Sequence, residues 1–136
     1  MTLKPPTTVD LVWTGDLQFA ANLSKTALVL DSAGNAGPSP VEALVAAIAG
    51  CMGMDLVHIL KRGRHELTAV RARLVADRSA DDPKRILAAA LHFSVSTSAP
   101  HDAIVRALEL SRDRYCSVWQ SMRQDIDFRV TFEVTN

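Results

Sequence analysis

Cysteine, proline, glycine and aromatic residues are all scarce in this chain of 136 residues, and neither sign of charge dominates. Two cysteines are too few for a small secreted domain held by disulfides, and six prolines with six glycines exclude collagen. Fifteen basic against fifteen acidic residues give a formal charge of zero, which argues against a nucleic-acid partner or an acidic membrane surface. With 48% hydrophobic residues the chain can still bury a sizeable core, so we predict a single domain over residues 1–136.

Long hydrophobic runs are also missing. The longest, residues 43–54, has twelve residues, whereas a helix that crosses a bilayer needs about twenty. The start of the chain, Met1-Thr-Leu-Lys-Pro-Pro, lacks the apolar stretch that follows the basic start of a signal peptide. We therefore expect a cytoplasmic protein with no membrane partner, in which cysteines stay reduced unless redox chemistry is their task.

The first half of the chain contains short strands and then a long helix. Residues 9–31 alternate apolar and polar side chains, which predicts strands, and residues 32–38 have the composition of a loop. Ser39-Pro40-Val41-Glu42 combines a capping serine, a proline at the first helical position and the glutamate of a capping box. This start predicts a helix that ends near Arg62, before Gly63. The helix is apolar nearly all round over its first half, so we expect it to lie buried in the core.

The second half predicts strands over residues 67–77 and 86–97, a helix over 100–113, a short helix over 117–122 and a final strand over 126–134. Strands and helices are partly segregated, which indicates an α+β fold with mostly antiparallel pairing. A long helix that is apolar on most sides needs cover all round. An intertwined homodimer would supply more cover than one chain can.

The two cysteines lie in different local contexts. Cys51 is in the middle of the long helix, where a thiol commonly packs as a small hydrophobic side chain, although Gly50 and Gly53 beside it allow something to approach the helix closely. Cys116 lies near a helix start and follows Arg112 and Arg114, and both features favour a thiolate. Local context alone therefore makes Cys116 the better candidate for an ionised thiol, with simple packing as the alternative for both.

Metal and phosphate chemistry have no recognisable motif here. Asp55 and His58 share a helix face, but His65 lies beyond Gly63 and no metal-ligand spacing results, so we predict no metal. The sequence also lacks a glycine-rich phosphate loop, a paired-cysteine zinc motif and a nucleophile elbow.

Taken together, the two cysteine segments resemble those of one family. The stretch Gly37-Pro-Ser-Pro-Val-Glu-Ala-Leu-Val-Ala-Ala-Ile-Ala-Gly-Cys51-Met-Gly-Met-Asp55 resembles the first-cysteine helix of the OsmC/Ohr family of osmotically inducible and organic hydroperoxide resistance proteins. Ser111-Arg-Asp-Arg-Tyr-Cys116-Ser-Val is similar to that family's second-cysteine segment. The order of the predicted elements matches over nearly the whole chain.

This resemblance implies an OsmC-like fold, in which sheets wrap around long central helices in an intertwined homodimer with sites at the interface. It implies a thiol-dependent peroxidase that reduces organic hydroperoxides in an oxidative stress response and needs no cofactor. Cys51 would be the peroxidatic cysteine and Cys116 the resolving one. The resulting Cys51–Cys116 disulfide would be reduced by an external dithiol, often of the lipoyl type.

One feature of the family's site is altered. Family members use an arginine from the amino-terminal strands, with a glutamate at the start of the first-cysteine helix, to keep the cysteine ionised. Here the first arginine is Arg62, and Glu42 lies one residue closer to the cysteine than the usual glutamate and is also the capping-box residue. Arg112 or Arg114, from the same chain or a partner, is then the candidate cation.

Residues around Cys51 would form an apolar substrate pocket, for which the candidates are Ile48, Met52 and Met54. Two alternatives to the peroxidase stay open. One is a non-catalytic stress protein that binds an apolar small molecule in the dimer-interface pocket. The other is a structural relative whose cysteines are merely packed.

Overall fold

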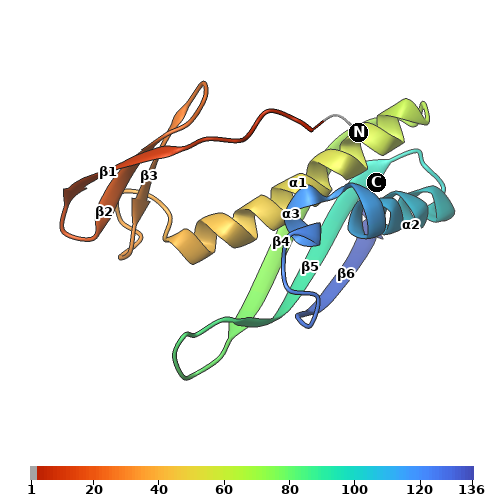
Figure 1. Cartoon of the computed structure of the whole chain (residues 1–136). Coiled ribbons are helices and arrows are strands. Elements are labelled where there is room, and N and C mark those ends of the chain that lie inside the picture. The colour runs from red at the N-terminus through yellow and green to blue at the C-terminus, as the bar shows by residue number, and fades with distance from the viewer. Residues whose placement is uncertain (1–2) are drawn as a thin grey trace. The chain divides into compact units, whose positions relative to one another are not determined.

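The computed structural model describes residues 3–136 and divides the chain into two compact units, residues up to Leu44 and residues 45–136 (Figure 1). The first unit is a sheet of three antiparallel strands. They are β1 (Asp10–Gly15), β2 (Gln18–Asn22) and β3 (Ala27–Asp31). A turn at Gly15-Asp16 joins β1 to β2, with positive φ angles of 124° and 46°. The strands expected between residues 9 and 31 are therefore present.

The first unit has almost no core of its own. Ala21 and Asp31 are its only buried residues among those described. Large apolar side chains remain at least a third exposed on all three strands, Trp13 at 64% and Val12 at 58% among them. Residues at sheet positions of this kind normally pack against another layer.

Helix α1 (Pro40–Arg62) begins in the first unit and continues through the second. The predicted capping box is present: Glu42 N–H donates to Ser39 Oγ at 3.2 Å, and Ser39 N–H donates to Glu42 Oε1 at 3.1 Å. The helix ends as expected before Gly63, whose N–H donates to the oxygen of Ile59 at 3.0 Å.

The expectation that α1 is buried on most sides is wrong for a single chain. Its buried side chains form one stripe at four-residue intervals: Ile48, Met52, Leu56 and Leu60. Of the residues in its most apolar stretch, only 22% are buried. Length and composition alone would let such a helix cross a membrane, but core helices of soluble proteins meet the same test. Periodicity shows how apolar a helix is and leaves open what covers it.

The second unit is built on a sheet in which β5 (Ile86–Thr97) lies between β4 (Leu67–Arg78) and β6 (Asp127–Val134) (Figure 1). Strands β4 and β5 pair antiparallel, whereas β5 and β6 pair parallel. Three of the four strand pairs are antiparallel, which confirms the expectation of mostly antiparallel pairing, and the β5–β6 pair is the exception. The reason is that the helical segment between β5 and β6 forms a crossover, which brings β6 back in the same direction.

The core of the second unit follows the alternation of apolar side chains along β5. Leu91, Phe93 and Val95 are all 0% exposed, and Ile104 of α2 (His101–Leu110) is also fully buried. The expected helix over 100–113 ends earlier than predicted, because residues Ser111–Tyr115 form the π-helical turn η1. Helix α3 (Ser117–Gln120) follows directly. The overall composition of helices and strands confirms the predicted α+β fold class.

Candidate functional site

The two cysteines lie on different elements of the second unit and differ in exposure. Cys51 is half-buried on α1, next to the buried stripe and one turn before Asp55. Cys116 is 0% exposed and is the N-cap residue of α3, immediately after η1. Both are free thiols.

Although they are far apart in the sequence, the two thiols lie near each other in the fold. The Cys51 side chain is close enough to Cys116 to raise the pKa of the Cys116 thiol. The approach is made by α1 on one side and by the η1–α3 junction on the other. A pair of sulfurs in this relation is what reversible disulfide chemistry requires.

The environment of Cys116 keeps its thiol protonated. Burial is the main cause that raises the pKa of Cys116 to about 11, and the neighbouring Cys51 thiol and Asp55 carboxylate act in the same direction. The N–H of Trp119, which donates to the Cys116 sulfur at 3.4 Å, acts in the opposite direction but is outweighed. The prediction from local context that Cys116 is the more readily ionised thiol is therefore wrong, since burial dominates over the helix-start amide.

The two arginines before Cys116 lie over aromatic rings. The Arg112 guanidinium is 5.1 Å from the ring centre of Phe128 and 5.9 Å from that of Trp119, while that of Arg114 is 5.8 Å from the ring of Tyr115. Among residues 3–136 no hydrogen bond or ion pair joins either guanidinium to Cys51. Arg112 nevertheless lies near Cys116, because its guanidinium is over the ring of Trp119 and the N–H of Trp119 donates to the Cys116 sulfur.

Ser111 is a site residue that the sequence pattern does not reveal. Its hydroxyl donates to Asp55 Oδ2 at 2.8 Å, and its backbone oxygen accepts the N–H of Cys116 at 2.7 Å. Ser111 is 0% exposed. A serine near the end of a predicted helix is ordinary, so only the fold identifies this one.

Glu42 belongs to the first unit, where its side chain is exposed and accepts the N–H of Ser39. The capping role predicted for it is confirmed. Its expected part in supporting Cys51 stays a prediction.

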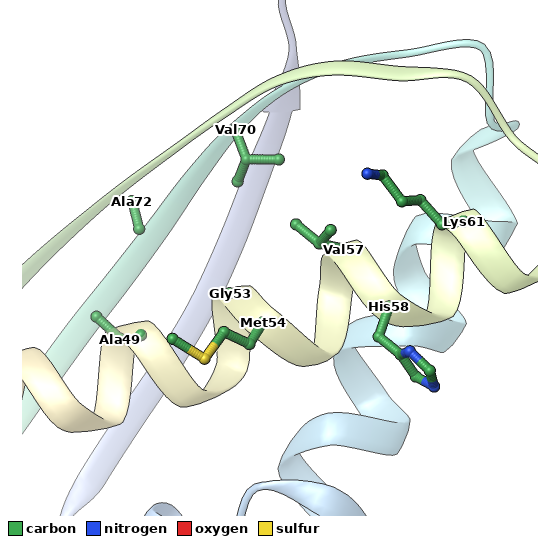
Figure 2. A pocket seen from close by; sticks show the side chains of 9 residues that line it. Ala49, Gly53, Met54, Val57, His58, Lys61, Val70 and Ala72 are labelled. Atoms are coloured by element: carbon green, nitrogen blue, oxygen red, sulfur yellow. The ribbon is translucent and has the colours of Figure 1, made fainter. Parts of the chain in front are cut away.

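A groove in the second unit runs along α1 beside β4 (Figure 2). It has a volume of about 570 Å³. Its lining is mostly apolar, and His58 and Lys61 are its two titratable side chains. The lining residues are Ala49, Gly50, Gly53, Met54, Val57, His58, Lys61, Val70 and Ala72. Of the three predicted pocket residues, Met54 lines the groove, whereas Ile48 and Met52 are 2% and 0% exposed in the core. The sequence pattern could not distinguish the groove-lining face of α1 from its buried face, because all three side chains are apolar.

Histidine, cysteine, aspartate and glutamate do not gather into groups of three or more that could hold a metal ion anywhere in residues 3–136. The side chains described above supply two thiols, a carboxylate and a hydroxyl.

Comparison with known proteins finds relatives of this chain in both sequence and structure. A sequence profile of the family described as OsmC-like protein matches residues 33–131. Protein YhfA of Escherichia coli K12 is 31% identical over 125 residues, covering 90% of this chain and 93% of that protein. A hypothetical protein from Aquifex aeolicus VF5 superposes with a TM-score of 0.89 at 25% identity, covering 97% of this chain and 98% of the other.

A more distant structure shares the fold. It is an organic hydroperoxide resistance protein OsmC from Legionella pneumophila, with a TM-score of 0.72 and 16% identity, covering 98% of this chain and all of the other. The profile match spans most of this chain, and YhfA exceeds 30% identity over nearly its full length. The chain belongs to the OsmC-like protein family.

Proposed function

We propose that this protein is a thiol peroxidase that reduces organic hydroperoxides through Cys51 and Cys116. The observation that carries the proposal is the proximity of the two thiols, which come from segments 65 residues apart in the sequence. Two free cysteines placed near each other in the fold are consistent with a reversible redox pair.

The proposed reaction has three steps. The Cys51 thiolate attacks the distal oxygen of the hydroperoxide, the O–O bond breaks, and the alcohol leaves after taking up a proton, so that Cys51 becomes a sulfenic acid. The Cys116 sulfur then attacks the Cys51 sulfur, forming the disulfide and releasing water. An external dithiol reduces this disulfide to two thiols and is itself oxidised to a disulfide, which closes the cycle.

Exposure and protonation favour Cys51 as the attacking residue. Cys51 is half-buried, whereas Cys116 is fully buried and holds its proton with a pKa of about 11. Because the thiolate is the nucleophile, a buried protonated thiol is poorly suited to attack a peroxide from solution. It is suited to a second step in which the target sulfur is already beside it.

We also propose that the working form is a homodimer. Within its own chain, α1 buries only one stripe of four side chains. On the β1–β3 sheet, Leu11, Val12 and Trp13 are each at least 45% exposed. A second copy of this chain would cover such faces, as the family resemblance implies. In that assembly the cation that activates Cys51 is Arg112 or Arg114, from either copy.

The family relation supports the substrate class. The Legionella pneumophila structure of the same fold is named an organic hydroperoxide resistance protein. The apolar groove beside α1 fits a hydroperoxide with an apolar substituent. We expect the reaction to take place in the cytoplasm, where reduced thiols persist.

A second candidate function is the non-catalytic binding of an apolar small molecule. Two observations favour it: the groove is mostly apolar, and the sequence has no arginine before Arg62. Neither cysteine is among the residues that line this groove.

One assay separates the two functions. The reduced protein is mixed with cumene hydroperoxide and dihydrolipoamide, and peroxide consumption is followed over many turnovers. The peroxidase predicts continuous consumption that dihydrolipoamide sustains. Two results together would overturn the peroxidase and support the binding protein. The thiols would not react with an equivalent of hydroperoxide, and tryptophan fluorescence would change saturably when a fatty acid is added.

A further inference from the structure

A second link joins the two cysteine-bearing segments, in addition to the proximity of the thiols themselves. Asp55 follows Cys51 by about one turn of α1, and its Oδ2 accepts the Ser111 hydroxyl at 2.8 Å. The backbone oxygen of Ser111 accepts the N–H of Cys116 at 2.7 Å. Two hydrogen bonds thus link Asp55 through Ser111 to Cys116, on the same two segments that bring the thiols near each other.

Burial makes this link specific. Ser111 and Cys116 are both 0% exposed, so the serine hydroxyl has no access to water in place of Asp55. A buried hydroxyl without a partner is costly, and one bonded to a carboxylate is held more strongly than one bonded to a neutral acceptor. The hydrogen bond therefore fixes where η1 lies against α1.

The local backbone supports the same conclusion. The Cys116 N–H reaches back five residues to Ser111, which is the π-helical pattern of Ser111–Tyr115. Compared with an α-helix, one inserted residue turns the following side chain by about 100° around the axis. The direction of the Cys116 side chain thus depends on the turn that Ser111 starts.

We propose that Asp55 and Ser111 form a positioning pair that holds Cys116 against Cys51 for disulfide formation, an inference that rests on the proposed peroxidase function. In this step the Cys116 sulfur attacks the sulfur of the Cys51 sulfenic acid. The S–S bond forms, the S–O bond breaks, and the proton of Cys116 leaves with the hydroxyl group as water. The Asp55 charge disfavours the thiolate of Cys116, so the pair also sets the pH at which this step accelerates.

The charged and titratable groups around Cys116 come from few elements. Helix α1 contributes Cys51 and Asp55, and both oppose its ionisation. On its own side, α3 contributes the Trp119 N–H, and the Arg112 guanidinium of η1 lies over the rings of Trp119 and Phe128, the latter on β6. Asp55 is thus the carboxylate whose removal should change the titration of Cys116.

Two substitutions test the pair by different routes. Ser111→Ala removes the hydrogen bond and leaves the charge, whereas Asp55→Asn keeps an acceptor and removes the charge. Matched controls are Ser117→Ala and Asp113→Asn, which alter exposed residues near Cys116. Each reduced protein receives one equivalent of cumene hydroperoxide. Trapping with dimedone measures the sulfenic acid, and intact mass after rapid alkylation measures the disulfide.

We expect Ser111→Ala to form the sulfenic acid within about twofold of the unaltered rate and the disulfide about tenfold more slowly. Asp55→Asn should shift the pH profile of disulfide formation to lower pH, and both controls should match the unaltered protein. The proposal is overturned if disulfide formation keeps its rate in Ser111→Ala and its pH profile in Asp55→Asn. If Ser111→Ala does not fold, the pH profile of disulfide formation in the isosteric Asp55→Asn variant decides between the two outcomes on its own. An unaltered protein that consumes peroxide without forming the disulfide overturns the proposed function instead.

Discussion

The segments that carry the two cysteines differ in nearly every physical respect. Cys51 is half-buried in the middle of a regular 23-residue helix, between glycines and next to a groove. Cys116 is fully buried at an irregular junction, where a π-helical turn passes directly into a four-residue helix. One thiol is placed where a small molecule can reach it, and the other is placed where only its partner can.

We propose that this difference gives separate tasks to chemically identical side chains. Access suits the residue that meets the peroxide, while burial and protonation suit the residue that waits for the sulfenic acid. The comparison can be sharpened or broken by changing each segment in turn.

Replacing the accessible thiol should have the largest effect. Cys51→Ser removes the proposed nucleophile, so we expect consumption of cumene hydroperoxide to fall by about a thousandfold or more, because a neutral hydroxyl is a far weaker nucleophile than a thiolate. A coupled assay with dihydrolipoamide measures this. Consumption at the unaltered rate would remove Cys51 from the mechanism.

Replacing the buried thiol should separate the two steps. Cys116→Ser should still consume about one equivalent of hydroperoxide, because Cys51 is intact, and should then accumulate sulfenic acid and higher oxidation states. Mass spectrometry detects these as additions of 16 or 32 Da, about the mass of one or two oxygen atoms. A variant that turns over with dihydrolipoamide as fast as the unaltered protein would show that no resolving cysteine is needed.

Two methionines on α1 test the contrast between its buried stripe and its exposed face. Met52 is 0% exposed, and Met52→Ala should lower the free energy of unfolding by about 2–5 kcal/mol. Met54 is 74% exposed in the single chain. If the chain stays monomeric, Met54→Ala should change the free energy of unfolding by less than about 0.5 kcal/mol. Urea unfolding gives both values. A large loss with Met54→Ala that depends on protein concentration would indicate that a second copy covers this face.

The protonation of Cys116 predicts the pH dependence of disulfide formation. Its pKa of about 11 lies above the ordinary thiol value, so its thiolate fraction rises about tenfold per pH unit below pH 11. Single-turnover disulfide formation limited by this thiol should rise similarly between about pH 6 and 9. Since the raised pKa means that folded protein holds this proton more tightly, stability should also fall between about pH 9 and 11. A flat rate profile would contradict the resolving role of a protonated Cys116.

The sequence predicted the regular parts of the molecule well, because their patterns are local. Alternation located β5, and the Ser39–Glu42 capping box set the start of α1 within one residue. The parallel pairing of β5 with β6 was missed, since alternation does not specify which strand lies alongside or in which direction it runs.

The irregular half of the site could not be predicted in the same way. The π-helical turn at Ser111 has the composition of an ordinary helix end, and the titration of Cys116 is set by burial that arises only in the folded unit. Local context favoured a thiolate there because it counts the nearby amide and arginines but not the loss of water. The pairing of the two cysteines came from family resemblance rather than from their spacing.

The most direct measurement of the central claim is a map of the disulfide after a single oxidation. Reduced protein is treated with one equivalent of cumene hydroperoxide, alkylated, digested and analysed by mass spectrometry. The account predicts that both thiols of a chain are lost together and that one bond joins Cys51 to Cys116 within that chain. Two thiols that remain free while the hydroperoxide persists, or a bond that joins Cys51 residues of two chains, would contradict it.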